Sequence, residues 1–192
     1  MHSVLFDHIA AKIALTHDEW EISRSVFIPK KIRRRQYLLT EGDPCKYMIF
    51  VNSGALRSYS IDDKGEEHII QFAIENWWIT DLYSFLTGEP ATDNIDALED
   101  SDLFLLDLPS YNMLFDRVPK FERYFRTLLQ NNFIASRERL IHTISGSAEE
   151  RYSYFMKEHA ALAQRVPQHM IASYLGLTPE TLSRVRRHAG HK

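Results

Sequence analysis

The sequence predicts an α+β protein in which an antiparallel β-domain with flanking helices precedes one long helix and a small helical domain. Three observations predict this order. Residues 27–107 contain many short β-branched and aromatic runs separated by turn signals, which is typical of a β-sandwich or barrel. Residues 119–145 carry apolar side chains at helical spacing, and residues 166–188 follow a helix-turn-helix pattern. We therefore expect domains at 1–118, 119–145 and 146–192.

The N-terminal 3–26 segment is expected to be helical. Val4, Leu5 and Ile9 lie at helical spacing. Thr16 and Glu19 then have the spacing of a capping box, which predicts the start of a second short helix.

The β-region is expected to contain a series of short strands. Asp62, Asp63, Lys64 and Gly65 form a turn signal between two such runs, which predicts a hairpin. The runs that read as strands are 31–40, 46–54, 55–61, 66–74, 94–98 and 102–108. Residues 80–86 are the exception, because they read as one or two helical turns.

After a short helix at 109–115, Pro119 is expected to open the long helix. The apolar side chains of this helix form a stripe along one face. The stripe either packs on the β-domain or forms a dimer seam, and the length of the helix favours the seam. Asn132 and Ser136 interrupt the stripe, and a polar seam residue can set register. The stripe consists of Phe121, Phe125, Leu128, Leu129, Phe133, Leu140 and Ile144. Residues 145–147 are expected to form a hinge, with Ser147 capping the next helix.

A helix-turn-helix needs a small residue where its helices cross, a residue that tolerates positive φ at the turn, and an apolar lock. Ala172 and Gly176 fill the first two positions. The lock is expected to consist of Ile171, Leu175, Leu177, Leu182 and Val185. Thr178 is a good N-cap and Pro179 a good first helical residue, so the second helix is expected to start there.

The outward face of this second helix is expected to contact DNA. Glu180 and Arg184 lie four residues apart, near the helix N-terminus where base edges are usually met. The alternative is a packing corner in which these two residues form only a surface ion pair. The remaining expected contacts are Gln168, Thr178, Ser183, Arg186 and Arg187, with Lys192 as a further phosphate contact.

Bulk properties exclude several other classes. Cys45 is the only cysteine, so neither an iron–sulfur cluster nor a cysteine zinc site is expected, and the nine histidines are scattered. His68 with Glu66 and Glu67 offers too few ligands for a metal enzyme on a cupin-like roll. We expect no enzyme, no metal, no membrane span and no export signal. The single cysteine favours a reducing, cytoplasmic setting. The net charge of −3 does not itself indicate nucleic acid, and a helical domain that binds protein is the second hypothesis.

The order of elements resembles the Crp/Fnr family of bacterial transcription regulators over nearly the whole chain. The resemblance rests on residues 171–178 with 180–184, on Gly42-Asp43, on the 50–54 turn and on Asp81-Leu82. It implies a jelly-roll β-roll like a cyclic-nucleotide-binding domain, a dimerisation helix, a homodimer on double-stranded DNA, and RNA polymerase as a further partner. It also implies that Glu180 and Arg184 read bases, since a carboxylate accepts from cytosine and a guanidinium binds guanine.

The chain departs from the family pattern at several places. Pro179 stands where the family has a basic residue, and the chain ends at Lys192, so little or no wing is expected. In the phosphate cassette, Thr80-Asp81 replaces Gly-Glu and Ala91 replaces the phosphate-binding arginine. A desolvated phosphate without its cation is costly, so no cyclic nucleotide cofactor is expected. An effector of another kind would meet Trp78, Thr80, Asp81, Leu82, Ala91 and Thr92.

Overall fold

The computed structural model describes residues 3–189, which form two compact units. The first unit contains the chain up to Ile61 together with Ile70–Leu128. The second contains Asp62–Ile69 and the chain from Leu129 onward. The division therefore falls inside the long helix, after Leu128. The three domains expected from the sequence stay a prediction.

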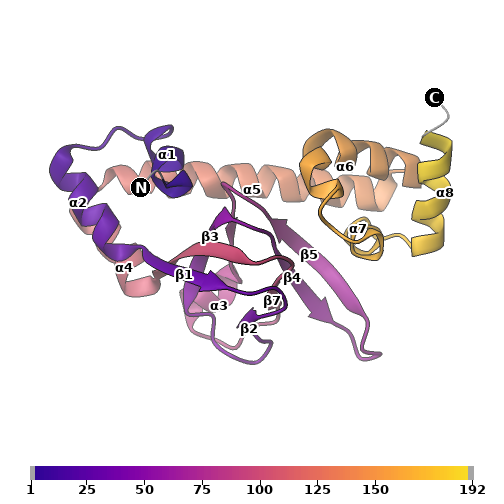
Figure 1. Ribbon diagram of the computed structural model, residues 1–192, viewed down its shortest axis with the longest axis horizontal. Coiled ribbons are helices and arrows are strands. Elements are labelled where there is room, and N and C mark those ends of the chain that lie inside the picture. Colours follow the sequence, from indigo (N-terminus) through magenta and orange to yellow (C-terminus); the bar gives the residue numbers. More distant parts are fainter. Residues whose placement is uncertain (1–2, 190–192) are drawn as a thin grey trace. The chain divides into compact units, whose positions relative to one another are not determined.

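The chain forms two four-stranded antiparallel sheets (Figure 1), which lie in the first unit except for the first three residues of β5. One has the order β1-β8-β3-β6, from Ile28–Ile32, Ser101–Asp107, Tyr47–Ser53 and Trp78–Ile79. The other has the order β2-β7-β4-β5, from Tyr37–Leu39, Asn94–Ala97, Leu56–Ile61 and Glu67–Ala73. This confirms the predicted β-roll and the β4–β5 hairpin. The sequence did not suggest strand β6, because two residues show no periodicity. The single run expected at 31–40 is wrong, because a turn divides it into the end of β1 and the strand β2, which lie in different sheets.

The two sheets share one hydrophobic core. In the first sheet, Ile49 pairs with Leu105 and both are buried; in the second, Leu56 pairs with Ala97, again both buried. Alternation of side chains along each strand aims these residues inward. The helices α1 (Val4–Ala10), α2 (His17–Val26) and α4 (Leu108–Arg117) contribute further residues to this core. The capping box between Thr16 and Glu19 is present at the start of α2.

A single short helix, α3 (Leu82–Thr87), interrupts the strands, as the sequence suggested for 80–86. Asp81 caps it by accepting a hydrogen bond from the Ser84 amide at 3.0 Å. Gly88 ends it with φ of +76°, a conformation that L side chains rarely adopt.

The long helix α5 (Lys120–Ser145) divides its apolar stripe between two environments. Phe121, Tyr124 and Phe125 are buried in the core of the first unit. Beyond Leu128 the stripe is exposed: Phe133 is 69% and Ile144 75% accessible. The packing interpretation is confirmed for the first part of the stripe. For the exposed part, the dimer seam stays a prediction.

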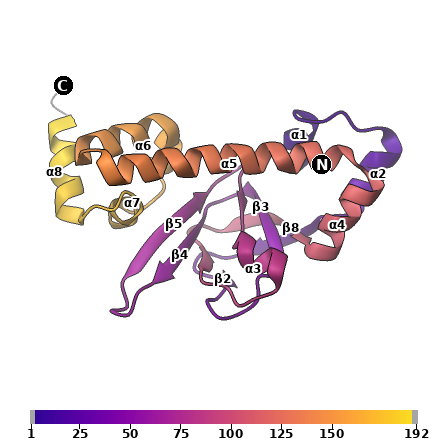
Figure 2. The ribbon, with the colours of Figure 1, turned by 180° about the vertical axis from the view of Figure 1, so that it is seen from behind.

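The second unit is helical, apart from the hairpin residues 62–69. After α5 it contains α6 (Ala148–Ala163), α7 (Gln168–Tyr174) and α8 (Pro179–Ala189), as Figure 2 shows from behind. Ser147 and Glu150 form a capping box at the start of α6, which agrees with the predicted cap. The Ser173 hydroxyl on α7 accepts a hydrogen bond from the Ile69 amide and donates one to the Glu67 carbonyl, both at 3.0 Å.

Candidate nucleic-acid interface

Helices α7 and α8 are held together by a small apolar lock. Ala172 is fully buried, so α8 can cross α7 closely without a steric clash. The side chains that fill the contact are at most 4% exposed; they are Ile171, Leu175, Leu182 and Val185. Leu177, the fifth predicted member, is half-buried. The lock fixes which face of α8 points outward.

The turn between the two helices depends on Gly176 and on Arg151. Gly176 has φ of +64°, and a Cβ there would meet nothing closer than 3.6 Å, so the constraint is conformational rather than steric. The Arg151 guanidinium donates to the carbonyls of Leu175 at 3.3 Å and Gly176 at 3.5 Å. Arg151 thereby joins α6 to the turn. Sequence reasoning missed it, because no pattern along the chain links residue 151 to residue 176.

The outward face of α8 is polar and open. Helix α8 begins at Pro179, and the Thr178 hydroxyl accepts a hydrogen bond from the Thr181 amide at 3.2 Å, as expected of an N-cap. The predicted contacts that are exposed are Thr178, Glu180, Ser183, Arg184, Arg186 and Arg187. Within the described part of the chain, Glu180 and Arg184 form no ion pair with each other or with other residues. The surface ion pair of the packing alternative is therefore not formed.

Two predicted contacts differ from this set. Gln168, the first residue of α7, is half-buried, and its Oε1 has no hydrogen-bond partner among the described residues. Lys192 lies outside the described residues.

In the predicted effector cassette, the Asp81 carboxylate accepts hydrogen bonds from backbone amides of two segments, the first turn of α3 and the segment at Thr92. One carboxylate oxygen accepts from the Ser84 amide at 3.0 Å and the other from the Thr92 amide at 3.1 Å. The side chain is only 7% exposed. A carboxylate of the protein thus occupies the amide donors that could otherwise bind an external anion.

The ionisable side chains near Asp81 are also acidic. Burial raises the pKa of Asp93, and the nearby carboxylates of Asp81 and Glu41 raise it further, against the hydrogen bond that Ser58 donates to it. Ala91 is buried and supplies no cation; its amide donates to the Asp43 carbonyl at 2.9 Å. This environment disfavours a bound phosphate.

The other predicted effector residues are dispersed. The Thr80 hydroxyl donates to the Tyr47 carbonyl at 3.2 Å, beside Cys45. Leu82 packs against the core as the first residue of α3. Trp78 packs against Phe50 and donates its indole N–H to Tyr124. The structure therefore brings Asp81, Leu82 and Thr92 together, while Trp78 belongs to the aromatic core.

One cluster of metal-ligating side chains lies on the β4–β5 hairpin. Asp62 joins Glu66 and His68, with ligand atoms within 4.8 Å of one another, and all three are exposed. The His68 ring lies 3.0 Å from the Asp62 carboxylate and lowers the pKa of Asp62. The other Asp62 oxygen accepts from the amides of Lys64 and Glu66. These bonds account for the cluster as a stabilised turn, and we assign no metal to it.

Residues 29–118 match the cyclic nucleotide-binding domain family. Over 169 residues the chain is 28% identical to the fumarate and nitrate reduction regulatory protein of Vibrio cholerae, covering 81% of this chain and 66% of that protein. It is 25% identical to the transcriptional regulatory protein btr of Bordetella pertussis, covering 95% of this chain and 80% of that protein. The chain is therefore similar to bacterial transcription regulators of the Crp/Fnr type. The resemblance read from the sequence is thereby confirmed.

Solved structures show the same Crp/Fnr fold. FixK2 from Bradyrhizobium japonicum superposes with a TM-score of 0.76 at 21% identity, over 86% of this chain and 85% of that one. The c-di-GMP responsive regulator CLP of Xanthomonas campestris gives 0.71 at 13% identity, over 92% of each chain. The chain spans about two thirds (66%) of the length of the V. cholerae relative. None of the helices described here is long and apolar enough to cross a membrane.

Proposed function

We propose that this chain is a homodimeric, sequence-specific DNA-binding transcription regulator. The observation that carries the proposal is the open face of α8. Glu180 and Arg184 are exposed there and form no ion pair with any described residue, while Leu182 and Val185 are buried. A structural helix would use such charges in pairs on its own surface. A recognition helix presents them free to base edges.

The chemistry of each side chain assigns its role. Glu180 would accept from cytosine N4, and Arg184 would donate two hydrogen bonds to guanine O6 and N7. Arg186 and Arg187 are exposed in the last turns of α8 and would contact phosphates. Thr178, Ser183 and Gln168 would position the helices on the backbone.

The exposed half of the α5 stripe supports a homodimer. Leu129, Phe133, Leu140 and Ile144 are between 42% and 75% exposed on one helix. An apolar stripe of this length on a helix is typical of a seam between two copies. Two copies would present two α8 helices to successive major grooves about 34 Å apart, and so read a palindromic site.

The β-roll is proposed to work without a cyclic nucleotide, because Asp81 occupies the amide donors and Ala91 leaves the cassette without a cation. A different small-molecule effector at the predicted set stays a prediction, as does contact with RNA polymerase. No catalytic activity is part of the proposal, and a role on bacterial DNA would place the protein in the cytoplasm.

Selection of bound duplexes from a random pool tests the proposal. The wild-type chain should enrich one palindromic motif. Glu180→Ala and Arg184→Ala should each relax one position of the motif, with a loss of about 1–3 kcal/mol in discrimination, or roughly 5- to 150-fold.

Arg186→Ala is the matched control. It removes the same charge from the same helix as Arg184→Ala, but should weaken binding to all sequences alike and leave the motif intact. A motif unchanged in both Glu180→Ala and Arg184→Ala would show that these residues do not read bases. No enriched motif with the wild-type chain would overturn the proposal in favour of a helical domain that binds protein.

A further inference from the structure

The β-roll carries a basic surface that is separate in sequence from the proposed DNA-reading residues of α8. Lys30, Lys31, Arg33, Arg34 and Arg35 are all exposed, so five of the 23 lysines and arginines of the chain lie within six residues. They occupy the end of β1 and the turn that follows it. We call this turn and its strand end the arginine turn, residues 30–35.

The backbone of the arginine turn is held firmly. The Arg33 amide donates to Gln36 Oε1 at 2.7 Å, and the Arg34 amide donates to the Asp100 carboxylate at 2.8 Å. The Arg35 amide donates to the Ala97 carbonyl at 2.7 Å, and Arg35 has φ of +67°. A non-glycine residue at positive φ persists only where its surroundings impose the conformation. The backbone from which the three arginine side chains extend is therefore fixed by hydrogen bonds.

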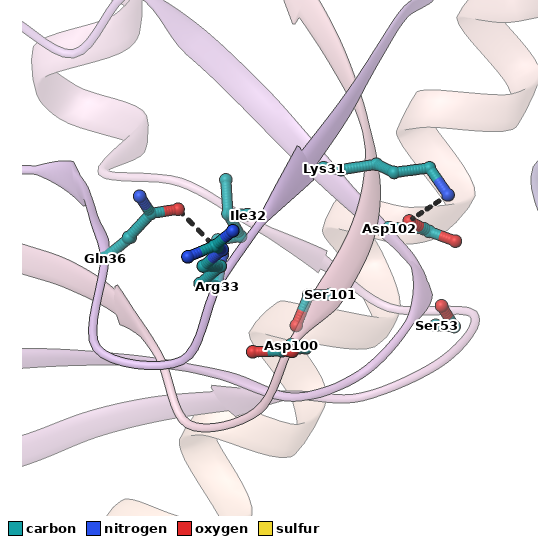
Figure 3. A pocket seen from close by; sticks show the side chains of 8 residues that line it. All are labelled: Lys31, Ile32, Arg33, Gln36, Ser53, Asp100, Ser101 and Asp102. Carbon is teal, nitrogen blue, oxygen red and sulfur yellow. Dashed lines mark hydrogen bonds and ion pairs between the residues drawn. The ribbon is translucent and has the colours of Figure 1, made fainter.

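The neighbouring acids do not neutralise these arginines. Lys31 pairs with Asp102 at 3.3 Å, as the dashed line in Figure 3 shows, and Asp100 is engaged by the Arg34 amide. Within the described chain, the guanidinium groups of Arg33, Arg34 and Arg35 form no ion pair or hydrogen bond. Three adjacent cations repel one another, so their arrangement is explained better by an anionic partner than by the fold.

A pocket of about 530 Å³ opens beside the arginine turn (Figure 3). Lys31 and Arg33 line it, but so do Asp100 and Asp102, which would repel an anion inside. An anionic partner would therefore contact the exposed guanidinium groups and not enter the pocket. This geometry suits an extended polyanion more than a small anion.

We propose that the arginine turn is a second, sequence-independent contact for the phosphates of duplex DNA. Guanidinium groups bind phosphate oxygens with two parallel hydrogen bonds. Duplex DNA carries about one negative charge per 1.7 Å of axis, so it offers several phosphates to three adjacent arginines. The inference rests on the proposed function only in that the chain meets DNA; it does not depend on base reading by Glu180 and Arg184.

The slope of log affinity against log salt tests the inference, using the full chain and a random-sequence duplex between about 50 and 300 mM KCl. The slope is negative, and each lost phosphate contact reduces its magnitude by about 0.9. The variant Arg33→Gln/Arg34→Gln/Arg35→Gln should reduce this magnitude by about 2 to 3. The charge-preserving variant with lysine at all three positions should restore most of the wild-type slope.

The matched control removes three exposed cations elsewhere on the roll unit, with Lys46, Arg117 and Arg126 each replaced by glutamine. The inference is overturned if the glutamine variant reduces the magnitude of the slope no more than the control variant does. An acidic protein would then be the candidate partner of the arginine turn. The selected motif should be the same for the glutamine variant and the wild type. Failure of the base-reading proposal, in contrast, would appear as no enriched motif with the wild-type chain, or as a motif unchanged in Glu180→Ala and Arg184→Ala, with the slope difference intact.

Discussion

The indole N–H of Trp78 donates a hydrogen bond to the hydroxyl of Tyr124, with 3.0 Å between Nε1 and Oη. The same hydroxyl lies 2.8 Å from His8 Nδ1. Because Trp78 can only donate, the Tyr124 oxygen accepts from it and its own proton is available to His8. Three segments far apart in the sequence, α1, β6 and α5, are joined by one hydroxyl group.

Tyr124→Phe should therefore destabilise the roll unit. The variant keeps the ring but leaves the Trp78 N–H without its acceptor, which costs about 1–3 kcal/mol in the free energy of unfolding. Urea unfolding measures the change. Tyr83→Phe is the control, because the Tyr83 side chain is 65% exposed and should change stability little. Equal midpoints for the two variants would show that the hydroxyl does not stabilise the fold.

Acid should weaken the roll unit through His8. Burial lowers the pKa of His8 from 6.5 to about 4, with a further contribution from Lys12. The unfolded chain therefore binds a proton at a higher pH than the folded chain, and stability present above pH 6.5 is lost as the pH falls toward 4. Since the ring is half-exposed, we expect a loss of about 1 kcal/mol.

Denaturant unfolding at several pH values, for the wild type and His8→Gln, measures this effect. The variant should lose the part of the pH dependence between 6.5 and 4 that His8 contributes. A wild-type stability that rises on acidification, or an identical pH dependence in the variant, would contradict the assignment.

Phe133→Glu should convert the proposed dimer to a monomer. Phe133 is 69% exposed at the centre of the free stripe, and a charge there would be buried without a partner in a seam. Sedimentation equilibrium measures the mass. Asn131→Glu adds the same charge to an exposed site on the opposite side of α5 and should leave the dimer intact. A monomeric wild type would show that the stripe has another role.

Asp81→Asn should destabilise the cassette. Asparagine keeps one acceptor oxygen but turns an NH₂ group toward one of the two amides, Ser84 or Thr92, so a buried donor loses its partner. We expect a loss of about 1–3 kcal/mol, seen as a lower thermal midpoint. The exposed Asp43→Asn is the control. An unchanged midpoint for Asp81→Asn would mean that these hydrogen bonds contribute nothing net.

Local signals in the sequence predicted most elements because their causes are local. The capping residues Thr16 and Ser147, the hairpin turn and Gly176 act on neighbours a few residues away, and each lies where the pattern indicated. The family fold followed from the order of these elements. Base reading by Glu180 and Arg184 followed from spacing and chemistry and awaits its test.

What could not be predicted depends on contacts between distant residues. No spacing shows that Tyr124 meets Trp78, that Arg151 meets the Gly176 turn, or that the Asp81 carboxylate meets the Thr92 amide. These polar contacts form only after the chain has folded, and a linear pattern does not contain them.

The connection between α5 and α6 is a single glycine between two helix boundaries. Gly146 donates its amide to the His142 carbonyl at 2.9 Å, and a Cβ there would approach that oxygen to 2.7 Å. On the other side, Ser147 and Glu150 fix the first turn of α6. Neither helix can shorten or lengthen at this point without breaking its own terminal bonds. An inserted residue at this connection would therefore disrupt the end of α5 or the first turn of α6, and would change how α6 follows α5.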